Sequence, residues 1–215
     1  MIKLYSYYRS SCSYRVRIAL NLKNLTYDYA PVHLVKEGGE QFQESFKKLN
    51  PSSKVPVLEH NGNSFFQSTA IIEYLDEVFP ENPLFPKEAV EKAKVRMLCE
   101  VINSDIQPLQ NLRLLKSLVG EYGLNDEQKV AWIRRWIGEG FNTYEALIKT
   151  TAGSYSIGDN PTAADCFIVP QVYNALRFEL DMSQFPTIQK VHDHCIKQEA
   201  FIKSHPDNQP DTPKD

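Results

Sequence analysis

Residues 1–80 alternate between two spacings of hydrophobic side chains. Short apolar runs typical of strands occur at 2–6 and 27–34, and two more flank Asn61-Gly62, which favours a tight hairpin because both residues tolerate positive φ. Apolar residues at i, i+3 and i+4 predict three helices, over 13–23, 39–49 and 68–78. This order predicts a thioredoxin-like domain with a small mixed sheet, whose first pair of strands is parallel and whose last pair is antiparallel.

A proline-rich stretch, PENPLFPKE, interrupts this pattern, because proline cannot continue a helix. We place a linker at 81–88, between a first domain at 1–80 and a second domain at 89–215. The second domain is expected to be all-helical, since its apolar residues keep the helical spacing in segments such as EQKVAWIRRWIGEGFNTYEALI. The fold class expected is therefore α/β followed by all-α.

Two local signals refine the second domain. Thr162, with Asp165 three residues later, has the spacing of a capping box, which predicts the start of a buried helix. The tail SHPDNQPDTPKD is polar and rich in proline, so we expect it to be disordered or laid over the surface.

Composition narrows the class of protein. A hydrophobic fraction of 42% is ample for a packed core, and a net charge of -3 argues against non-specific binding to nucleic acid. No stretch approaches the ~18 apolar residues of a membrane span, and the sequence MIKLYSYY lacks the apolar region of a signal peptide. The four cysteines are far apart and no His pair has zinc spacing, so neither disulfides nor a metal site are expected. These features favour a cytoplasmic location.

A cluster of small polar side chains and arginines stands where the first helix is predicted to begin. It consists of Arg9, Ser10, Ser11, Cys12, Ser13, Arg15 and Arg17. A helix N-terminus attracts anions, because its first backbone N–H groups have no partner within the helix. The cluster is therefore a candidate anion site, and the alternative is a polar helix cap with arginines on a solvated face.

Two further segments carry hydrogen-bonding groups. Pro56 opens a predicted strand, so Val55-Pro56 is a candidate cis peptide at a strand edge that could pair with a ligand. An ordinary edge strand that turns is the alternative. Gln67 and Ser68 stand at the start of the third helix and could hold a carboxylate there, although a plain helix cap is equally economical.

Several segments together resemble one protein family. They are RSSCSYRVRIAL, NPSSKVPVLE, QSTAIIEYLDE, IQPLQN, TAADCFIVPQV and PTI, in that order. The likeness extends over the whole chain and is to the zeta class of glutathione S-transferases, within it to enzymes that isomerise maleylacetoacetate. It implies a thioredoxin-like domain followed by a helical domain, in agreement with the hydrophobic pattern.

The resemblance also implies how the tripeptide glutathione is bound. Ser10 and Ser11 would lie beside its sulfur, with Cys12 just behind them, and either serine could donate to the thiolate. Val55 would pair its backbone with the tripeptide, while Gln67 and Ser68 would hold its γ-glutamyl carboxylate. The residues implied to reach the ligand from the edge of the site are Gln41, Gln107 and Asn111.

Arginines are the candidates for binding a dicarboxylate substrate, namely Arg9, Arg15, Arg113 and Arg177. Arg9 and Arg177 resemble the arginines of the family that receive substrate carboxylates, and a planar guanidinium binds a carboxylate bidentately. Arg113 departs from the family, where a small polar residue often stands. For Arg177, the alternative is a surface ion pair with Glu179 or Asp181.

The activity implied is a glutathione-dependent cis-trans isomerisation of maleylacetoacetate in tyrosine and phenylalanine breakdown. Maleylpyruvate isomerisation, glutathione transfer to small α-halo acids and a non-catalytic glutathione-fold binding protein are the alternatives. The resemblance further implies a homodimer.

Overall fold

The computed structural model describes residues 1–214, apart from the side chain of Glu37, and divides into two compact units. The first unit is Met1–Leu84 together with the C-terminal residues from Lys197, and the second is Phe85–Ile196. The first unit contains the strands β1 (Ile2–Ser6), β2 (Asp28–Pro31), β3 (Val57–His60) and β4 (Asn63–Phe66). Its helices are α1 (Ser11–Leu22), α2 (Glu44–Leu49), α3 (Ser68–Val78) and α10 (Glu199–Ser204), with short turns η1 (Lys36–Gly38), η2 (Glu40–Phe42) and η5 (Pro206–Asn208).

The four strands form one mixed sheet in the order β2-β1-β3-β4. Strand β1 is parallel to β2 and antiparallel to β3, and β3 is antiparallel to β4. The turn between β3 and β4 places Asn61 at φ 50° and Gly62 at φ 78°, as the hairpin prediction requires. The thioredoxin-like topology predicted from the sequence is thus confirmed.

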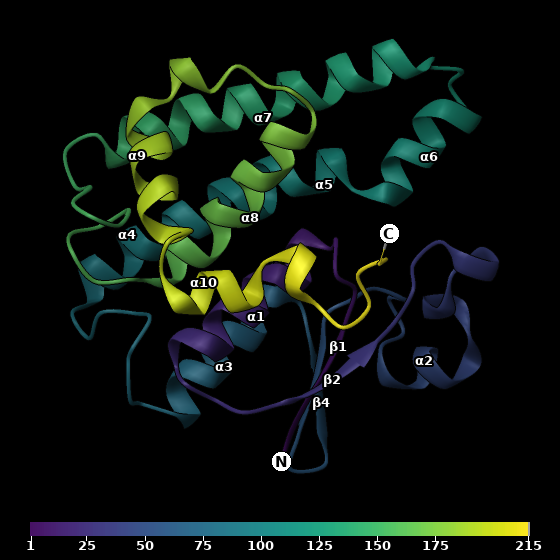
Figure 1. Ribbon diagram of the computed structural model, residues 1–215, viewed down its shortest axis with the longest axis horizontal. Coiled ribbons are helices and arrows are strands. Elements are labelled where there is room, and N and C mark those ends of the chain that lie inside the picture. Colours follow the sequence, from purple (N-terminus) through teal and green to yellow (C-terminus); the bar gives the residue numbers. More distant parts are fainter. Residues whose placement is uncertain (215) are drawn as a thin grey trace. The chain divides into compact units, whose positions relative to one another are not determined.

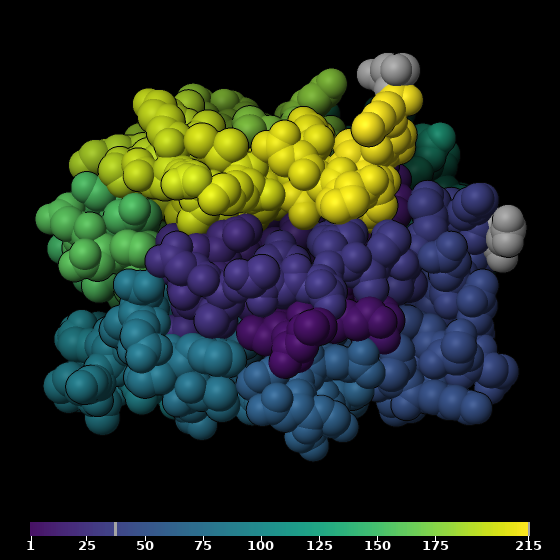
Figure 2. Space-filling model, turned by 60° about the horizontal axis from the view of Figure 1, so that its bottom comes forward, coloured from purple at the N-terminus to yellow at the C-terminus, as the bar shows by residue number. Residues whose placement is uncertain are grey.

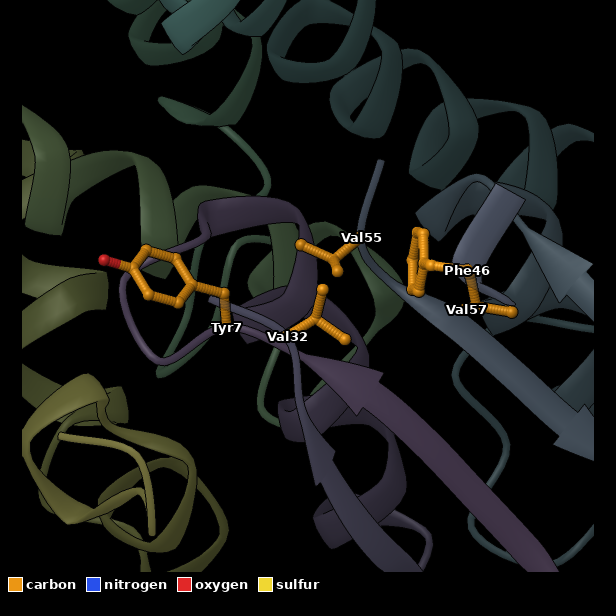
Figure 3. Close-up of a cluster of buried hydrophobic side chains, with 5 residues drawn as sticks. All are labelled: Tyr7, Val32, Phe46, Val55 and Val57. Atoms are coloured by element: carbon orange, nitrogen blue, oxygen red, sulfur yellow. The ribbon is translucent and has the colours of Figure 1, made fainter. Parts of the chain in front are cut away.

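Helix α1 is central to the first unit, where it packs against both α3 and α10 (Figure 1). Its residues Val16, Ile18 and Leu20 point in different directions around the helix, and all are fully buried because α1 is covered on more than one side. A second apolar cluster lies at the end of the sheet from which the chain leaves β1. Figure 3 shows its members, Tyr7, Val32, Phe46, Val55 and Val57.

The second unit is helical, as expected. Its elements are α4 (Ala89–Glu100), the π-helical turn η3 (Val101–Ile106), α5 (Gln107–Gln110), α6 (Leu112–Gly120), α7 (Asp126–Ile148), α8 (Ala163–Arg177), η4 (Met182–Gln184) and α9 (Pro186–Cys195). The predicted capping box is present, with the Asp165 carboxylate accepting from the Thr162 backbone N–H at 2.8 Å. No helix among residues 1–214 is both long and apolar enough to cross a bilayer.

The C-terminal tail differs from the expected domain division. The residues from Lys197 pack with the first unit, whereas the sequence analysis places them in the helical domain. Helix α10 lies along α1, and the space-filling view shows the C-terminal segment in yellow against the purple N-terminal residues (Figure 2). Of the two alternatives for the tail, disorder is wrong, because Pro206 and Gln209 are buried within this unit.

Candidate functional site

The small polar residues of the cluster differ in whether their side chains are bonded within the protein. Ser10 is the N-cap of α1, and its Oγ accepts a hydrogen bond from the Ser13 backbone N–H at 3.2 Å. Ser11 is the first residue of the helix, and its hydroxyl and the Cys12 thiol are both half-buried and make no hydrogen bond within the described part of the chain. The Ser11 and Cys12 side chains therefore stand at the positive end of the α1 dipole, next to its first N–H groups.

Two arginines of the cluster are fully buried. Arg15 donates from Nη1 to the Ser68 Oγ at 3.1 Å, which ties α1 to the start of α3. The expectation that Arg15 receives a substrate carboxylate is therefore corrected. Its guanidinium has no exposed surface and instead donates a hydrogen bond to the Ser68 hydroxyl. Arg17 donates to the carbonyl oxygens of Tyr7 and Tyr8, and burial lowers the pKa of its guanidinium.

The segment before β3 supplies a free stretch of backbone. The Val55-Pro56 peptide bond is cis, as predicted. The ladder with β1 begins at Val57, so the backbone of Val55 lies outside the sheet pairing. The Val55 side chain is buried and points toward Val32 in the apolar cluster, as Figure 3 shows. With its side chain held in the core, the Val55 main chain has a fixed position beside the sheet.

The start of α3 forms a second polar helix end. Gln67 occupies the position before the helix with φ 74°, an uncommon conformation for a residue other than glycine. Its side chain is exposed, whereas Ser68 is buried against the Arg15 guanidinium. Strained conformations of this kind persist where the surrounding structure enforces them, and they concentrate at binding sites. The first N–H groups of α3, the Ser68 hydroxyl and the nearby Arg15 charge together suit a carboxylate.

Aromatic residues directly before α1 pack together beside the polar cluster and carry no charge. Tyr7 packs edge to face on Tyr8 and on His33, with ring centroids 4.8 and 5.1 Å apart. Burial raises the pKa of the Tyr7 hydroxyl, and the Arg9 charge opposes that rise in part. The phenol therefore stays protonated at neutral pH, and the cationic groups of this region are not neutralised by it.

Gln41 lies differently from its expected place at the edge of the site. Its side chain is buried, the amide nitrogen donates to the Leu34 carbonyl oxygen at 3.2 Å, and the amide oxygen is buried as well. Neither polar atom is presented to a ligand in this arrangement. No pattern in the sequence indicates this arrangement, because it depends on the backbone at Gly39 lying directly against the Gln41 side chain.

Four of the expected site residues belong to the second unit, namely Gln107, Asn111, Arg113 and Arg177. Gln107 opens α5 and is half-buried, Arg113 is exposed on α6, and Arg177 is exposed in the last turn of α8. The Arg177 guanidinium lies 5.1 Å from the centroid of the Phe178 ring. Of the two acids considered as its partners, Glu179 forms an ion pair with Arg134 at 3.0 Å.

Asn111 has a structural role in this unit. Its side-chain oxygen caps α6 by accepting from the Leu114 N–H at 3.0 Å, and its amide nitrogen donates to the Pro108 carbonyl oxygen at 2.7 Å. The segment from Gln107 to Asn111 is also held by Trp132, whose indole N–H donates to the Leu109 carbonyl oxygen at 2.7 Å. These contacts give the segment a fixed backbone.

One polar residue close to the cluster was not singled out from the sequence. Asp211, in the tail, accepts from the Tyr8 backbone N–H at 2.9 Å and from the Tyr29 hydroxyl at 2.6 Å. No sequence signal pointed to it, because the partners are separated by about the whole length of the chain and a lone aspartate in a proline-rich tail is ordinary.

Comparison with known proteins gives concordant results. Residues 4–83 match the family model described as the glutathione S-transferase N-terminal domain. Maleylacetoacetate isomerase of Dictyostelium discoideum is 47% identical over 97% of this chain and 94% of its own length. The holo structure of a bacterial maleylpyruvate isomerase of the zeta class superimposes with a TM-score of 0.95 at 43% identity, covering 98% of this chain and all of that one.

A solved structure also contains the tripeptide. Maleylacetoacetate isomerase of Anaeromyxobacter dehalogenans, described with glutathione bound in its active site, has a TM-score of 0.88 at 42% identity, covering 99% of this chain and 98% of the other. Similarity of this extent, over nearly the full length of both chains, is far more than a shared thioredoxin-like fold would produce. The chain therefore belongs to the zeta class of glutathione S-transferases, the family that contains the maleylacetoacetate and maleylpyruvate isomerases.

Proposed function

We propose that this protein is a glutathione-dependent cis-trans isomerase of maleylacetoacetate, acting in tyrosine and phenylalanine breakdown. The observation that carries the proposal is the grouping, within the first unit, of a hydroxyl-lined helix end and a carboxylate-binding helix end joined by the Arg15–Ser68 hydrogen bond. The similarity to proteins named for this isomerisation supports the choice of reaction.

The residues of the first unit offer groups for the sulfur, the backbone and the γ-glutamyl carboxylate of glutathione. The α1 start offers hydroxyls for the sulfur, the Val55 main chain lies outside the ladder and is open to backbone pairing, and the α3 start offers N–H groups and Ser68 for a carboxylate. When bound, glutathione supplies the thiolate that adds to the cis double bond and departs after rotation.

We assign the hydrogen bond to the thiolate primarily to Ser11. The Ser10 oxygen is engaged as the acceptor of the Ser13 N–H, which leaves its O–H as a second donor for the sulfur, whereas the Ser11 hydroxyl makes no hydrogen bond within the described part of the chain. Lowering a thiol pKa by about two units requires ~2.7 kcal/mol. A helix N-terminus supplies about 0.3–1 kcal/mol, up to ~2 where it is partly buried, and a hydrogen bond to a charged group supplies about 1.5–3 kcal/mol, so the two together suffice.

The substrate's carboxylates are proposed to be bound by Arg9 and Arg177, with Arg113 adding positive charge. Each of these three side chains is at least partly exposed, unlike Arg15. Their permanent charge and planar geometry favour a dicarboxylate over a neutral molecule. Maleylpyruvate is the second candidate substrate, because a maleylpyruvate isomerase superimposes on this chain with a TM-score of 0.95.

The proposal is tested by following both diacids by proton NMR, with and without glutathione. We expect conversion to the trans product, with glutathione required and not consumed, and a higher kcat/KM for maleylacetoacetate. Conversion of neither diacid, combined with conjugation of a halogenated substrate, would show the protein to be a transferase instead. A higher kcat/KM for maleylpyruvate would select the second candidate.

The role of Arg177 is tested in the same assay. Arg177→Ala should lower kcat/KM for the diacid about tenfold or more, the effect of losing a charge-assisted hydrogen bond. Conjugation of a neutral halogenated substrate should change little, and Arg177→Lys should restore part of the loss because it keeps the charge without the fork. Equal losses on both substrates would exclude a contact with the substrate carboxylate.

We also propose that the protein is a homodimer located in the cytoplasm. Each unit leaves apolar side chains exposed: Phe66 and Val78 in the first, and Val90 and Met97 on α4 in the second. Val90 and Met97 are seven residues apart and therefore lie on one face of α4. Exposed apolar side chains that gather on one helix face are typical of a subunit interface.

A further inference from the structure

The C-terminal tail reaches the polar cluster through one carboxylate. Each oxygen of Asp211 accepts one hydrogen bond: Oδ2 from the Tyr8 backbone N–H at 2.9 Å, and Oδ1 from the Tyr29 hydroxyl at 2.6 Å. Bonds to an ionised acceptor are stronger than those between neutral groups. Burial and the bond to Asp211 both raise the pKa of Tyr29, so the phenol remains a donor over the physiological range.

Tyr8 belongs to the turn that leads from β1 into α1. The turn is closed by the Ser10 N–H, which donates to the Tyr7 carbonyl oxygen at 3.0 Å. The buried Arg17 holds the carbonyl side of the same turn, donating to Tyr7 at 3.3 Å and to Tyr8 at 2.9 Å. Asp211 holds the N–H side, so the turn is fixed from both sides by charged groups.

The tail that carries Asp211 is itself anchored. The Gln209 amide donates to the carbonyl oxygens of Lys203 and His205 at 2.9 and 2.8 Å, and the Thr212 hydroxyl donates to the Pro206 carbonyl oxygen. At the end of α10, just before the tail, the Ser204 carbonyl oxygen accepts from Arg17 Nε at 3.0 Å. The tail thus presents Asp211 from a folded segment rather than from a loose end.

We propose that Asp211 is a positioning residue for the thiolate site, which it serves by fixing the turn that sets Ser10 and Ser11 at the start of α1. The inference rests on the proposed function, because it assumes that these serines face the glutathione sulfur. A turn outside any ladder is among the most mobile parts of a fold unless its peptide groups are bonded. Catalysis is sensitive to such mobility, since a misplacement of about 1 Å can lower a rate about a hundredfold.

The alternative is that Asp211 only fastens the tail to the surface. Both roles predict some loss of thermal stability when the carboxylate is removed. They differ in the thiol pKa of bound glutathione, which the alternative leaves unchanged. They also differ in amide exchange at Ser10, whose N–H closes the turn without contacting Asp211: the alternative leaves this exchange unchanged, whereas exchange at Tyr8 rises under both roles because its N–H loses its acceptor.

The experiment uses the full chain with Asp211→Ala, Asp211→Asn and Tyr29→Phe. Asp211→Asn keeps an acceptor for the Tyr8 N–H, so its effect should be smaller than that of Asp211→Ala. Tyr29→Phe removes only the hydrogen bond from the Tyr29 hydroxyl to Asp211. The matched control is Asp207→Ala, which removes the same charge from an exposed position in the same segment.

Three readouts are compared across these variants. Amide hydrogen exchange of the free protein at Ser10 reports on the order of the turn. Ultraviolet titration of the binary complex reports the thiol pKa of bound glutathione. Calorimetry with S-methylglutathione, which has no ionisable thiol, reports binding of the rest of the tripeptide.

We expect Asp211→Ala to speed exchange at Ser10, raise the bound thiol pKa toward that of free glutathione and lower kcat about tenfold, while the affinity for S-methylglutathione stays within about twofold. Tyr29→Phe and Asp211→Asn should give smaller shifts in the same direction, and Asp207→Ala none. A lower melting temperature with unchanged thiol pKa and unchanged exchange at Ser10 would overturn the inference. If Ser10→Ala with Ser11→Ala shifts the thiol pKa but none of the Asp211 or Tyr29 variants does, the proposed function stands and this inference fails. If the wild-type complex shows the thiol pKa of free glutathione, the proposed function itself fails, and the inference with it.

Discussion

At the scale of single residues, the arginine- and serine-rich cluster separates into buried and exposed members. Arg17 is completely buried and has its guanidinium bonded to backbone and hydroxyl oxygens, so its charge serves the fold. Ser10 is the N-cap of α1, and Ser11 and Cys12 remain partly accessible. Residues that look equivalent in the sequence therefore have different tasks, because a helix start uses some polar groups for itself.

The division between Ser10, Ser11 and Cys12 predicts different consequences of substitution. Ser10→Ala should lower the free energy of unfolding by about 1 kcal/mol, the usual cost of losing an N-cap. Ser11→Ala should instead raise the thiol pKa of bound glutathione and lower kcat, with little change in stability. Cys12→Ala should reduce activity less than the double change Ser10→Ala, Ser11→Ala.

Urea unfolding and initial rates at saturating glutathione measure these effects. Ser11→Thr serves as the control, since it keeps the hydroxyl. A larger loss from Cys12→Ala than from the double serine variant would mean that the thiol, not the hydroxyls, carries the reaction.

At the scale of elements, helix α7 contains two glycines with opposite surroundings. A Cβ added at Gly140 would lie 2.3 Å from the Cδ1 and Cγ1 atoms of Ile106, at the end of η3, whereas a Cβ at Gly138 meets nothing within 4 Å. Ile106 is completely buried and cannot move aside freely. Gly140 therefore permits the close approach of α7 to the segment that leads into Gln107.

Gly138→Ala should stabilise the protein by about 0.5–1 kcal/mol, because alanine is the better helix former. Gly140→Ala should destabilise it, since overpacking a core costs about 1–3 kcal/mol and exceeds that gain. Urea unfolding measures both variants. Adding Ile106→Ala to Gly140→Ala should make the two changes less costly together than the sum of their separate effects. Strict additivity would contradict the proposed contact.

The sequence pattern predicted elements unevenly. Helix α3 has the predicted bounds, Ser68–Val78, because a clear apolar spacing begins just after a loop residue. The π-helical turn at Val101–Ile106 was not predicted, since its residues read as a continuation of α4. An extra residue in one helical turn changes the spacing of apolar residues very little. The π-helical turn is stabilised by the helices packed against it.

At the scale of the whole molecule, the homodimer is the prediction that reaches beyond one chain. Light scattering at micromolar concentration should give twice the 24.7 kDa mass of the chain. Met97→Asp should shift the protein toward the monomer, because it places a charge on the exposed apolar face of α4.

Val119→Asp is the matched control, since Val119 is also an exposed apolar residue on a helix of the second unit and lies outside the face proposed for contact. A wild-type mass of one chain would refute the dimer. Dissociation caused by Val119→Asp but not by Met97→Asp would move the interface from α4 to α6.

The sequence by itself determined the order of strands and helices, the mixed sheet and the family, while the structure decided between the cis Val55-Pro56 bond and an ordinary edge strand. The first three depend on local spacing and on motifs whose residues are close together in the chain, so they can be read from it. Only the tertiary structure decided that Arg15 and Gln41 are buried, that Ser10 is used as a cap, and that the tail packs with the first unit and brings Asp211 to Tyr8. The physical reason is that burial and long-range hydrogen bonds depend on which segments meet, and a polar residue has the same appearance in the sequence whether it binds a ligand or the protein's own backbone.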